Sequence, residues 1–485
     1  MSELDDAGGT ALGAHTAMPG ERPEPGVGGA RGDAWRDGDD GVRWPARSMA
    51  AGARAVLEDM ARMLPDGEAP AAIFNDAEIF ALERERVFAR SWVYLAHESE
   101  IPDPGDYVLR YIVDDPFIVV RDADGEIRAL HNHCRHRGMQ VCRSEAGNAS
   151  NFRCPYHGWT YKNDGRLVGV PVQKQAYGDR LDKDALGLVR IPRLDSSHGL
   201  IFGCLDPDVV ALDEWLGDIR WYLDLFTLRS PAGLEVIGAP QRWVVDVDWK
   251  IAGENFIGDS YHTLMTHRSM VELGQAPRDP KYAMYGEQVR IPGKGHGAML
   301  IGAPPGTDLP PFWGYPDDAI ERARTSLPTP EQFDVAYETR IMLGSVFPNL
   351  SIHNPIRRPD HHHPSSVPMM TIRVWNPRGP GRIEIFSWFA VERDMSDEFK
   401  QLSSWSYLRS FGISGTFEQD DTEIWTHIAR NAGTFTGRAQ RVNYQMGSDV
   451  EPDADWPGPG VAIPVNFTDA NLRGFYERWL ELMLA

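Results

Sequence analysis

Two short segments that each combine a cysteine with a histidine constrain the fold more than any other feature of this chain. They are Cys134-x-His136 and Cys154-x-x-His157, with seventeen residues between them. Four such side chains can share one metal site only when two loops bring them together. The strand-like residues around both segments therefore predict two neighbouring hairpins, each with a metal-binding loop.

These four residues could bind either of two metal groups. In a 2Fe–2S cluster with mixed ligands, two cysteines bind one iron and two histidines bind the other, which raises the reduction potential above that of an all-cysteine cluster. A structural zinc ion is the alternative, but zinc fingers usually take both cysteines from one segment and both histidines from the other. The alternation of cysteine with histidine within each segment therefore favours the cluster.

A second group of candidate metal ligands lies between Glu254 and His267. Asp259 and His262 are three residues apart and would share one face of a helix, whereas His267 could join them only if the helix were distorted or broken. Two histidines and one carboxylate on one face of iron(II) leave positions open for dioxygen. An Asp-x-x-His pair on a helix is also typical of a hydrogen-bonded surface feature, so the residues alone leave both interpretations open.

Charge and hydropathy exclude two classes of partner. The formal net charge is −21 and no block of basic residues interrupts it, which argues against nucleic acid because phosphate binding needs clustered Lys and Arg. No apolar run reaches the roughly 18–20 residues that a membrane span needs. We also find no basic segment followed by an apolar one at the N-terminus, so we expect a cytoplasmic protein.

The chain has four cysteines, which is too few for a disulfide scaffold in 485 residues. Cys134 and Cys154 belong to the metal motifs. Cys142 and Cys204 stand apart from any such pattern, and we expect both to be small buried hydrophobic residues.

The distribution of residue types predicts two folded domains after an unstructured leader. Residues 1–51 contain almost no large apolar side chain and are expected to be disordered, at least up to Gly41. Residues 52–90 are expected to be helical and to join the catalytic domain. Residues 91–208 are expected to form a small all-β domain and residues 209–485 a larger mixed one, so the predicted fold class is α+β.

Several elements can be predicted inside these domains. We expect strands at Tyr107–Arg121 and Glu126–Leu130, joined by a turn at 122–125, and at Phe152–Tyr161 and Leu167–Val170, with a turn at 163–165. A further strand is expected at Gln241–Trp249, and two paired strands at Thr371–Asn376 and Arg382–Val391. Helices are expected at Ala77–Arg90 with Asp76 as N-cap, at Ala252–Met270, at Ser396–Ser410 and from about Thr468. The proline-rich stretches 303–316 and 359–368 are expected to be loops, with His361–His363 solvated rather than bound to metal.

The metal motifs resemble those of a known family. His-Asn-His-Cys-Arg-His-Arg-Gly at 131–138 and Cys-Pro-Tyr-His-Gly-Trp at 154–159 are similar to the two Rieske motifs of the ring-hydroxylating oxygenases, and residues 145–149 between them also resemble that family. The stretch 254–267 is similar to the mononuclear iron motif of the naphthalene-, biphenyl- and toluene-type dioxygenases. The likeness extends from about Ala77 to the end of the sequence, and the long leader departs from it.

The resemblance implies two cofactors and their ligands. A Rieske 2Fe–2S cluster would be bound by Cys134, His136, Cys154 and His157, and one mononuclear Fe(II) by His262, His267 and an aspartate on a later helix. The segment 411–421 resembles that later helix, and its second aspartate, Asp421 rather than Asp420, matches the ligand.

Further residues receive roles through the same likeness. Asp259 would lie on the electron path, hydrogen-bonded to His262 in its own subunit and to His157 of the partner subunit. Asn255 would lie near the iron as a supporting group. The weaker candidates for the substrate pocket are neighbours of the iron motifs: Phe256, Leu264 and Phe411.

By the same resemblance, the chain is expected to be the large (alpha) subunit of an aromatic-ring dioxygenase. The fold would be a β-rich Rieske domain beside a catalytic domain with an antiparallel sheet flanked by helices. Electrons would come from NADH through a reductase or ferredoxin, and dioxygen would be added to an aromatic ring to give a cis-dihydrodiol. Head-to-tail trimers, with small beta subunits in an α3β3 assembly, would bring each cluster to the iron of the neighbouring subunit.

Two other functions are compatible with the motifs. A Rieske monooxygenase or demethylase would use the same metals with a different outcome, and a non-enzymatic electron carrier or zinc-binding module would lack the mononuclear iron. The substrate class stays open between an aromatic hydrocarbon and an aromatic carboxylate such as phthalate.

Overall fold

The computed structural model describes residues 49–273, 279–304, 306, 309–359, 363 and 365–485. The predicted leader lies outside the described residues up to Ser48, and helix α1 (Ala51–Met63) begins at its last residue. His361 and His362, in the proline-rich loop, also lie outside the described residues.

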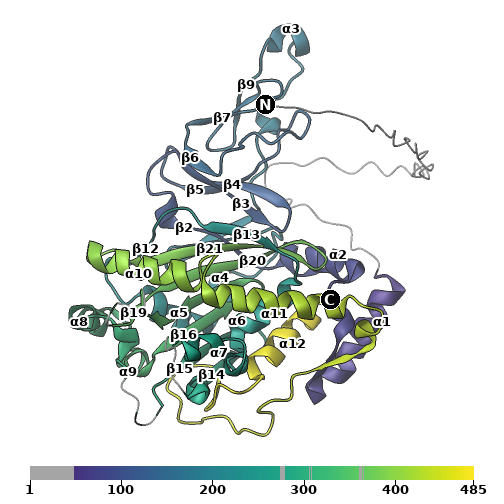
Figure 1. Ribbon diagram of the computed structural model, residues 1–485. Helices are drawn as coiled ribbons and strands as arrows, with labels where there is room; N and C mark the ends of the chain where they lie inside the picture. The colour runs from purple at the N-terminus through teal and green to yellow at the C-terminus, as the bar shows by residue number, and fades with distance from the viewer. Residues whose placement is uncertain (1–48, 274–278, 305, 307–308, 360–362, 364) are drawn as a thin grey trace, which may run out of the picture. The chain divides into compact units, whose positions relative to one another are not determined.

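A nine-stranded antiparallel sheet positions the catalytic part of the chain (Figure 1). Its central strands β15, β16 and β17 are buried at every residue, which means that both faces of the sheet are covered. The predicted pairing of Thr371–Asn376 with Arg382–Val391 is confirmed by the β20–β21 hairpin. The strand order is β12 (Leu234–Val236), β21 (Arg382–Glu392), β20 (Met370–Gly379), β17 (Leu350–Asn354), β16 (Ile341–Val346), β15 (His296–Ile301), β14 (Gly286–Ile291) and β23 (Val461–Ile463), and β13 (Gln241–Val245) also pairs with β21.

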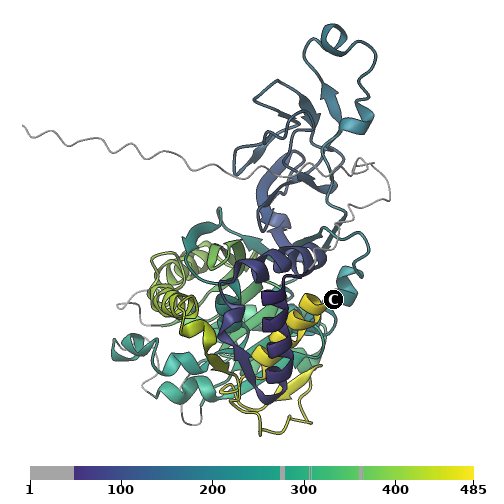
Figure 2. The ribbon, with the colours of Figure 1, turned by 90° about the vertical axis from the view of Figure 1, so that its right-hand side faces the viewer.

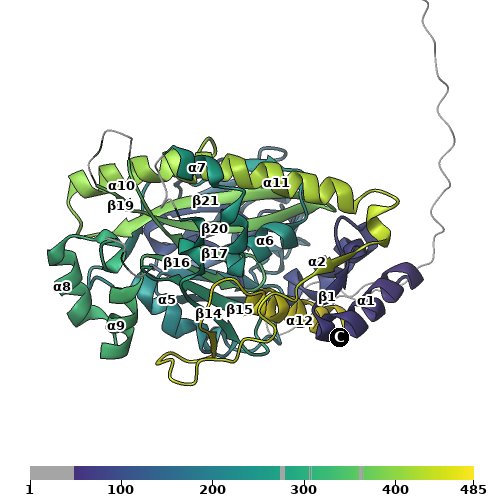
Figure 3. The same ribbon diagram turned by 60° about the horizontal axis from the view of Figure 1, so that its bottom comes forward.

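Helices from distant parts of the sequence cover this sheet. Helix α6 (Trp249–Gly258) contacts β15, β16, β17 and β20, and α12 (Ala470–Leu484) packs beside it on β14 and β15 (Figure 3). Helices α1 and α2 (Ala77–Arg86), near the start of the chain, lie against α12 near its end (Figure 2). Helix α11 (Thr416–Ala432) contacts both α6 and α10 (Asp397–Ser410).

Helix capping agrees with the sequence at two positions. The Asp76 side chain accepts hydrogen bonds from the backbone N–H groups of Glu78 and Ile79, at 2.8 and 3.0 Å, as its predicted role as an N-cap requires. The Ser396 hydroxyl accepts a bond from the backbone N–H of Phe399. The predicted helix 77–90 ends earlier, at Arg86, and continues as a single 3-10 turn over Phe88–Arg90.

A buried ionic group ties α2, α6 and α12 together. The Lys250 ammonium, on α6, is fully buried and lies 2.6 Å from Glu83 Oε1 and 2.8 Å from Asp248 Oδ1. The Glu83 carboxylate also accepts the indole N–H groups of Trp249 and Trp479. Because every charge in this group has a partner, its burial is compatible with a stable fold.

The segment 91–208 is built from short antiparallel strands, as predicted, but two expected strands are each interrupted. Tyr107–Arg121 forms two strands, β3 (Asp106–Ile112) and β4 (Asp115–Arg121), which turn at Val113 with a φ of 58° and pair with each other. Phe152–Tyr161 forms β7 (Asn151–Arg153) and β8 (Thr160–Lys162), with the second metal motif as the loop between them. Turn chemistry therefore overrides the apolar pattern of the sequence in both places.

The strands of this segment lie in three small sheets and share two cores. The sheet β5 (Ile127–His131), β4, β3 and β6 (Ala146–Asn148) and the sheet β7, β8 and β9 (Leu167–Gly169) enclose a core around Leu130, Cys134, Cys154 and Tyr161. The third sheet, β10 (Arg193–Ser197), β11 (Leu200–Cys204) and β2 (Val93–His97), packs into the main core of the chain, where the Tyr94 and Trp388 rings meet.

The remaining elements are short. They are β1 (Glu68–Pro70) paired with β22 (Arg441–Asn443), β18 (Ile356–Arg357) paired with β19 (Val367–Pro368), and the helices α3 (Gln173–Tyr177), α4 (Leu212–Leu216), α5 (Ile219–Thr227), α7 (Arg268–Glu272), α8 (Asp317–Ser326) and α9 (Pro330–Glu338). The predicted strand 241–249 ends at Val245, because α6 begins at Trp249.

Candidate metal centres

The first two metal motifs fold into loops with the same backbone hydrogen bonds. The Cys134 N–H bonds to the Met139 carbonyl at 2.9 Å, and the Cys154 N–H bonds to the Trp159 carbonyl at 2.8 Å. In each loop a glycine four residues after the cysteine returns a bond to the cysteine carbonyl. Both glycines have a positive φ, 79° and 74°, which other residues rarely adopt, and a Cβ at Gly138 would also lie 2.7 Å from the His133 ring.

The two loops present their cysteines inward and their histidines outward. Cys134 and Cys154 are 1% and 2% exposed, whereas His136 and His157 are half-buried. The Nδ1 atoms of the two imidazoles lie 3.1 Å apart, and the His136 ring stacks on the Trp159 indole. The Tyr161 hydroxyl lies 3.2 Å from Cys134 Sγ and accepts the Arg135 backbone N–H.

The geometry of these four residues separates a cluster from a single zinc ion. Ligands of one zinc ion, at about 2.0–2.3 Å from it, must all lie within about 4 Å of one another. Among the described residues, only one group of His, Cys, Asp or Glu side chains brings at least three ligand atoms within 4.8 Å of one another. That group is His262, His267 and Asp421, and it does not include the cysteine and histidine motifs. The two cysteines and two histidines form two pairs rather than one tetrahedron, which fits a cluster with two irons.

The second centre depends on a break in the predicted helix 252–270. Helix α6 ends at Gly258, a 3-10 turn covers Tyr261–Leu264, and α7 begins only at Arg268. At Gly258 a side chain would come within 3.0 Å of Asn471 and Gln288, so helix α6 passes close to its neighbours there. The spacing of His262 and His267 predicted that the two side chains could meet only if the helix between them were distorted or broken, and the helix is broken there.

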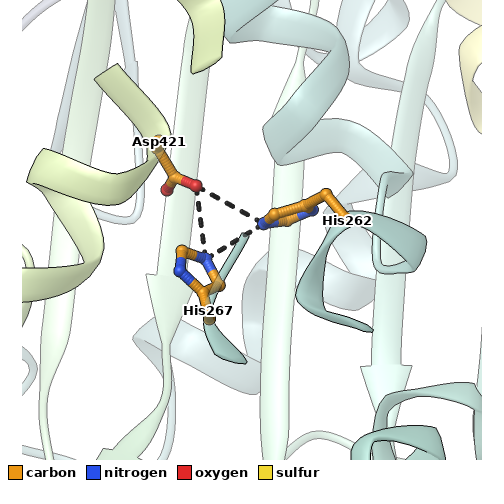
Figure 4. A group of neighbouring side chains, drawn as sticks. All are labelled: His262, His267 and Asp421. Carbon is orange, nitrogen blue, oxygen red and sulfur yellow. Dashed lines mark hydrogen bonds and ion pairs between the residues drawn. The ribbon is translucent and has the colours of Figure 1, made fainter. Parts of the chain in front are cut away.

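The three predicted iron ligands converge from two separate segments (Figure 4). The Nε2 atoms of His262 and His267 lie 3.1 Å apart, and Asp421 Oδ1 lies 3.5 Å from the first and 3.2 Å from the second. Ligands at about 2.1 Å from one metal ion, at right angles to each other, are about 3 Å apart. No group among the described residues donates a hydrogen bond to the buried Asp421 Oδ1, so the residues fit a metal ion at this point.

A carboxylate stands behind each histidine of this group. Asp259 accepts the His262 backbone N–H at 3.2 Å, and its Oδ2 lies 3.6 Å from His262 Nδ1. Asp420 Oδ2 lies 3.4 Å from His267 Nδ1 and accepts the Ser269 hydroxyl. Such carboxylates orient an imidazole so that its other nitrogen faces the metal. Asp420 therefore supports His267, and Asp421 is the aspartate of the pair that meets both Nε2 atoms.

The electrostatics of the group favour a cation. Burial lowers the pKa of His262, but Asp259 and then Asp421 outweigh this effect and raise that pKa to about 9. For Asp259, burial acts to raise the pKa, yet the His262 imidazole and its hydrogen bonds hold it below its ordinary value. A site that attracts a proton so strongly would also attract a divalent metal ion in its place.

A largely apolar pocket adjoins the three converging residues. It encloses about 500 Å³ not occupied by atoms, part of which is continuous with solvent. Asn255 lines it, as do Phe256 and Phe411, two of the three pocket candidates from the sequence. The third, Leu264, ends the 3-10 turn that follows α6, and its neighbour Thr263 lines the pocket instead. The other lining residues are Asp259, Ser260, Tyr282, Met299, Ile301, Ile341, Leu343, His353, Arg357 and Phe417, besides the three candidate ligands.

Sequence reasoning missed several residues of these sites. Tyr161 and Trp159 contact the ligands of the first centre, and His353 and Arg357 line the pocket of the second. Trp159 is the last residue of the second motif and Tyr161 follows it by two residues, so their closeness to the ligands in sequence was a usable signal. His353 and Arg357 carry no such signal, because strand pairing places them beside the pocket: His353 is on β17, which pairs with β16 and β20, and Arg357 is on β18, which pairs with β19.

Both parts of the chain match known protein families. Residues 91–191 match the family described as the Rieske [2Fe-2S] domain, and residues 212–485 match the family described as the ring-hydroxylating alpha subunit, catalytic domain. None of the helices in the described residues combines the length and the apolar character that crossing a membrane requires.

Individual relatives cover most of the chain. The N,N-dimethyl phenylurea N-demethylase subunit alpha of Sphingobium sp. (strain YBL2) is 38% identical and covers 86% of this chain and 92% of its own length. The chlorobenzene dioxygenase subunit alpha of Cupriavidus sp. (strain PS12) is 34% identical, covering 91% and 94%. The structure of naphthalene 1,2-dioxygenase from Rhodococcus sp. bound to indole superimposes with a TM-score of 0.87 at 52% identity, covering 90% and 99%.

The two family matches, the relatives and the fold agree with the metal motifs. A 2Fe–2S cluster in the Rieske domain and a mononuclear iron in the catalytic domain are the cofactors of this family. The chain therefore belongs to the alpha subunits of the ring-hydroxylating dioxygenases.

Proposed function

We propose that this chain is the catalytic subunit of a terminal oxygenase that adds both atoms of dioxygen to neighbouring carbons of an aromatic ring. The observation that carries this proposal is the position of His262, His267 and Asp421 at a pocket whose lining is mainly apolar and aromatic. One dioxygen, two electrons and two protons would be consumed for each ring, no group would leave, and the product would be a cis-dihydrodiol.

The proposal assigns a role to each group of residues. His262, His267 and Asp421 would hold iron(II), which supplies one-electron chemistry and open positions for dioxygen. Asn255, whose side-chain amide lies 3.3 Å from His262 Nδ1, would keep that ring in place. Phe256 and Phe411 would hold the flat substrate and exclude water.

The cluster would be held by Cys134 and Cys154 through sulfur and by His136 and His157 through Nδ1. The half-buried histidines are the part of this site nearest to solvent, so electrons would enter and leave on their side. Among the described residues, the side-chain partners of Asp259 are Asn255 and His262. A bond between Asp259 and His157 of the partner subunit would complete an electron path in a head-to-tail trimer.

The partners follow from the same scheme. The electrons would come from NADH through a reductase, with or without a ferredoxin. The small beta subunit and an α3β3 assembly, both inferred from family resemblance, belong to the proposal, as does a cytoplasmic location. A trimer of this kind must close into a ring, since its contacts are head-to-tail.

A demethylase is the second candidate function, because a relative 38% identical over most of the chain is named as an N-demethylase. The deciding experiment mixes the purified oxygenase with its reductase and NADH. It then adds ¹⁸O₂ and one of two substrates, naphthalene or an N,N-dimethyl phenylurea. A cis-dihydrodiol carrying two labelled atoms supports the dioxygenase, whereas formaldehyde release with no dihydrodiol supports the demethylase. If neither substrate reacts on protein with three irons per chain, a wider panel of aromatic compounds must yield a dihydrodiol for the proposal to stand.

A further inference from the structure

Arg357 is a buried cation on the wall of the catalytic pocket. It belongs to the short strand β18, is 8% exposed, and lines the pocket together with Tyr282 and the candidate iron ligands. Its guanidinium lies 4.3 Å from the centre of the Phe417 ring, and that ring lies 4.6 Å from the His267 imidazole. One aromatic ring therefore contacts both the cation and a candidate iron ligand.

The other buried arginines of the described residues have their charge or their hydrogen-bonding groups matched. Three form ion pairs with buried glutamates, and a fourth donates to backbone carbonyls of three residues: these are Arg110 with Glu100, Arg229 with Glu392, Arg373 with Glu418, and Arg340 with Leu309, Tyr337 and Thr339.

Arg357 differs from all four. Its guanidinium donates to the carbonyl of its own neighbour, Ile356, and no carboxylate of the described residues lies within ion-pair distance. Its Nε atom is buried without a hydrogen-bond partner among the described residues, as are those of Arg110, Arg229 and Arg373, so what sets Arg357 apart is that it has neither a carboxylate nor several carbonyls around its guanidinium. Burial lowers the pKa of Arg357, and the Tyr282 hydroxyl is the group that opposes this effect. A cation so placed lacks a counter-ion.

A second polar group lines the same pocket. His353, on β17, is buried, and its Nδ1 atom also has no hydrogen-bond partner among the described residues. Its ring packs edge-on against Phe411, at 4.6 Å between centres. Burial and then the Arg357 cation keep the pKa of His353 far below its ordinary value, so the ring is neutral and can donate or accept one hydrogen bond.

We propose that Arg357 is a specificity-determining residue that binds a carboxylate group of the aromatic substrate, with His353 as a second polar contact. The substrate class is then an aromatic acid rather than a hydrocarbon. A guanidinium recognises a carboxylate through paired, charge-assisted hydrogen bonds, and the phenyl rings and aliphatic side chains of the pocket would hold the ring itself. This inference rests on the proposed oxygenase function and makes its substrate more specific.

The test measures binding and turnover separately, with three ligands that share one ring. Benzoate carries the charge, benzamide has nearly the same shape without it, and toluene has neither the charge nor the polar group. Isothermal titration calorimetry on the oxidised holoenzyme gives binding without turnover, and dihydrodiol formation with reductase and NADH gives kcat and KM. We expect benzoate to bind at least roughly 10-fold more tightly than benzamide or toluene.

Two variants assign the preference to Arg357. Arg357→Met removes the charge and should raise KM for benzoate roughly 10- to 100-fold relative to KM for toluene measured on the same variant. Arg357→Lys keeps the charge but cannot form the paired hydrogen bonds, so it should retain part of the preference for benzoate over benzamide. If Arg357→Met does not fold, this variant provides the test of the role of Arg357. Arg340→Met is the matched control, because Arg340 is buried, has no carboxylate partner in the described part of the chain, and is not among the pocket residues.

The outcomes distinguish this inference from the proposed function. Equal or weaker binding of benzoate than of benzamide by the wild-type protein overturns the role of Arg357, as does a preference that survives in Arg357→Met. If toluene is dihydroxylated and benzoate is neither bound nor converted, the function stands and the inference fails. If benzoate binds through Arg357 but no ring is hydroxylated by protein with its full iron content, the inference stands and the proposed function fails.

Discussion

Asp420 and Asp421 are consecutive residues of α11 that meet opposite sides of the same imidazole. Asp420 Oδ2 lies 3.4 Å from Nδ1 of His267, and Asp421 Oδ1 lies 3.2 Å from Nε2. Asp420 is partly exposed and has a hydrogen bond from Ser269, whereas the buried Asp421 Oδ1 has no such bond from any residue that the structure describes. Two neighbouring carboxylates thus have different tasks, one holding the ring and one completing the metal site.

This difference predicts unequal effects of two substitutions. Asp421→Ala should remove the mononuclear iron, so that metal analysis finds two irons per chain instead of three, and turnover should fall below detection. Asp420→Ala should keep the iron and lower activity or iron affinity about 10- to 100-fold, as loss of a supporting carboxylate does. The visible spectrum of the cluster serves as the control in both, and equal iron loss in the two variants would contradict the assignment.

Asp259→Asn should separate electron supply from metal binding. The asparagine keeps the size of the side chain but loses the charge beside His262, so both metal centres should remain while steady-state turnover falls at least about 100-fold. A single-turnover experiment with chemically reduced iron and cluster should still form product. Normal steady-state turnover in this variant would remove Asp259 from the electron path.

Tyr161→Phe should lower the reduction potential of the cluster. The Tyr161 hydroxyl lies 3.2 Å from Cys134 Sγ and already accepts the Arg135 N–H, so its own proton is available to the sulfur. Hydrogen bonds to ligand sulfur favour the reduced cluster, and one bond worth about 1 kcal/mol corresponds to about 40 mV in a one-electron couple. Protein-film voltammetry measures the shift. An unchanged or higher potential would contradict this role of the hydroxyl.

Lys250→Met should destabilise the catalytic domain. The substitution leaves the carboxylates of Glu83 and Asp248 buried without their cation, which costs about 3–5 kcal/mol. Chemical denaturation followed by tryptophan fluorescence gives the free energy of unfolding. Arg268→Met is the control, because its ion pair with Glu272 is exposed and should contribute less than about 1 kcal/mol.

Glu254 should make stability fall as pH rises above about 5. Burial raises its pKa from 4.5 to about 8, although the Tyr444 and Tyr476 hydroxyls bond to its carboxylate. Between these two values the folded state keeps a proton that the unfolded state releases, so the free energy of unfolding decreases with pH and the loss is complete above about pH 8.

Comparison of variants can isolate this contribution. Glu254→Gln should flatten the dependence between pH 5 and pH 8 by an amount on the order of a few kcal/mol, because the amide does not titrate. Denaturation curves at several pH values measure it, with the exposed Glu272→Gln as the control. An unchanged slope in Glu254→Gln would place the titration elsewhere.

The sequence predicted those features that depend on neighbours along the chain. The caps at Asp76 and Ser396, the β20–β21 hairpin and the all-β character of 91–208 are local properties of residue type and spacing. The strand expected at Tyr107–Arg121 was wrong as a single element, because the apolar pattern continues through the turn at Val113 and gives no sign of the reversal.

Some residues of the site could be predicted from the sequence, and others could not. The geometry of the Cys/His loops and the need for a break before His267 followed from spacing, whereas the choice of Asp421 followed from resemblance to a family. Arg357 and His353 could not be predicted, since His353 lies on β17 and Arg357 on β18, two strands whose place beside the pocket is set by their pairing with β16, β20 and β19 rather than by a motif. Thr263 rather than Leu264 lines the pocket of the structure, and spacing alone does not indicate how the chain leaves a helix.

The break after α6 also distinguishes the two metal centres in how firmly the polypeptide holds them. The cluster loops are closed by their own backbone hydrogen bonds, whereas His262 and His267 stand on a short irregular stretch with exposed Met265 between them. Such a stretch can open locally without disturbing the sheet beneath. The single iron should therefore exchange in an otherwise intact molecule, so that preparations of the protein differ in their content of mononuclear iron while keeping the same fold and the same visible spectrum of the cluster.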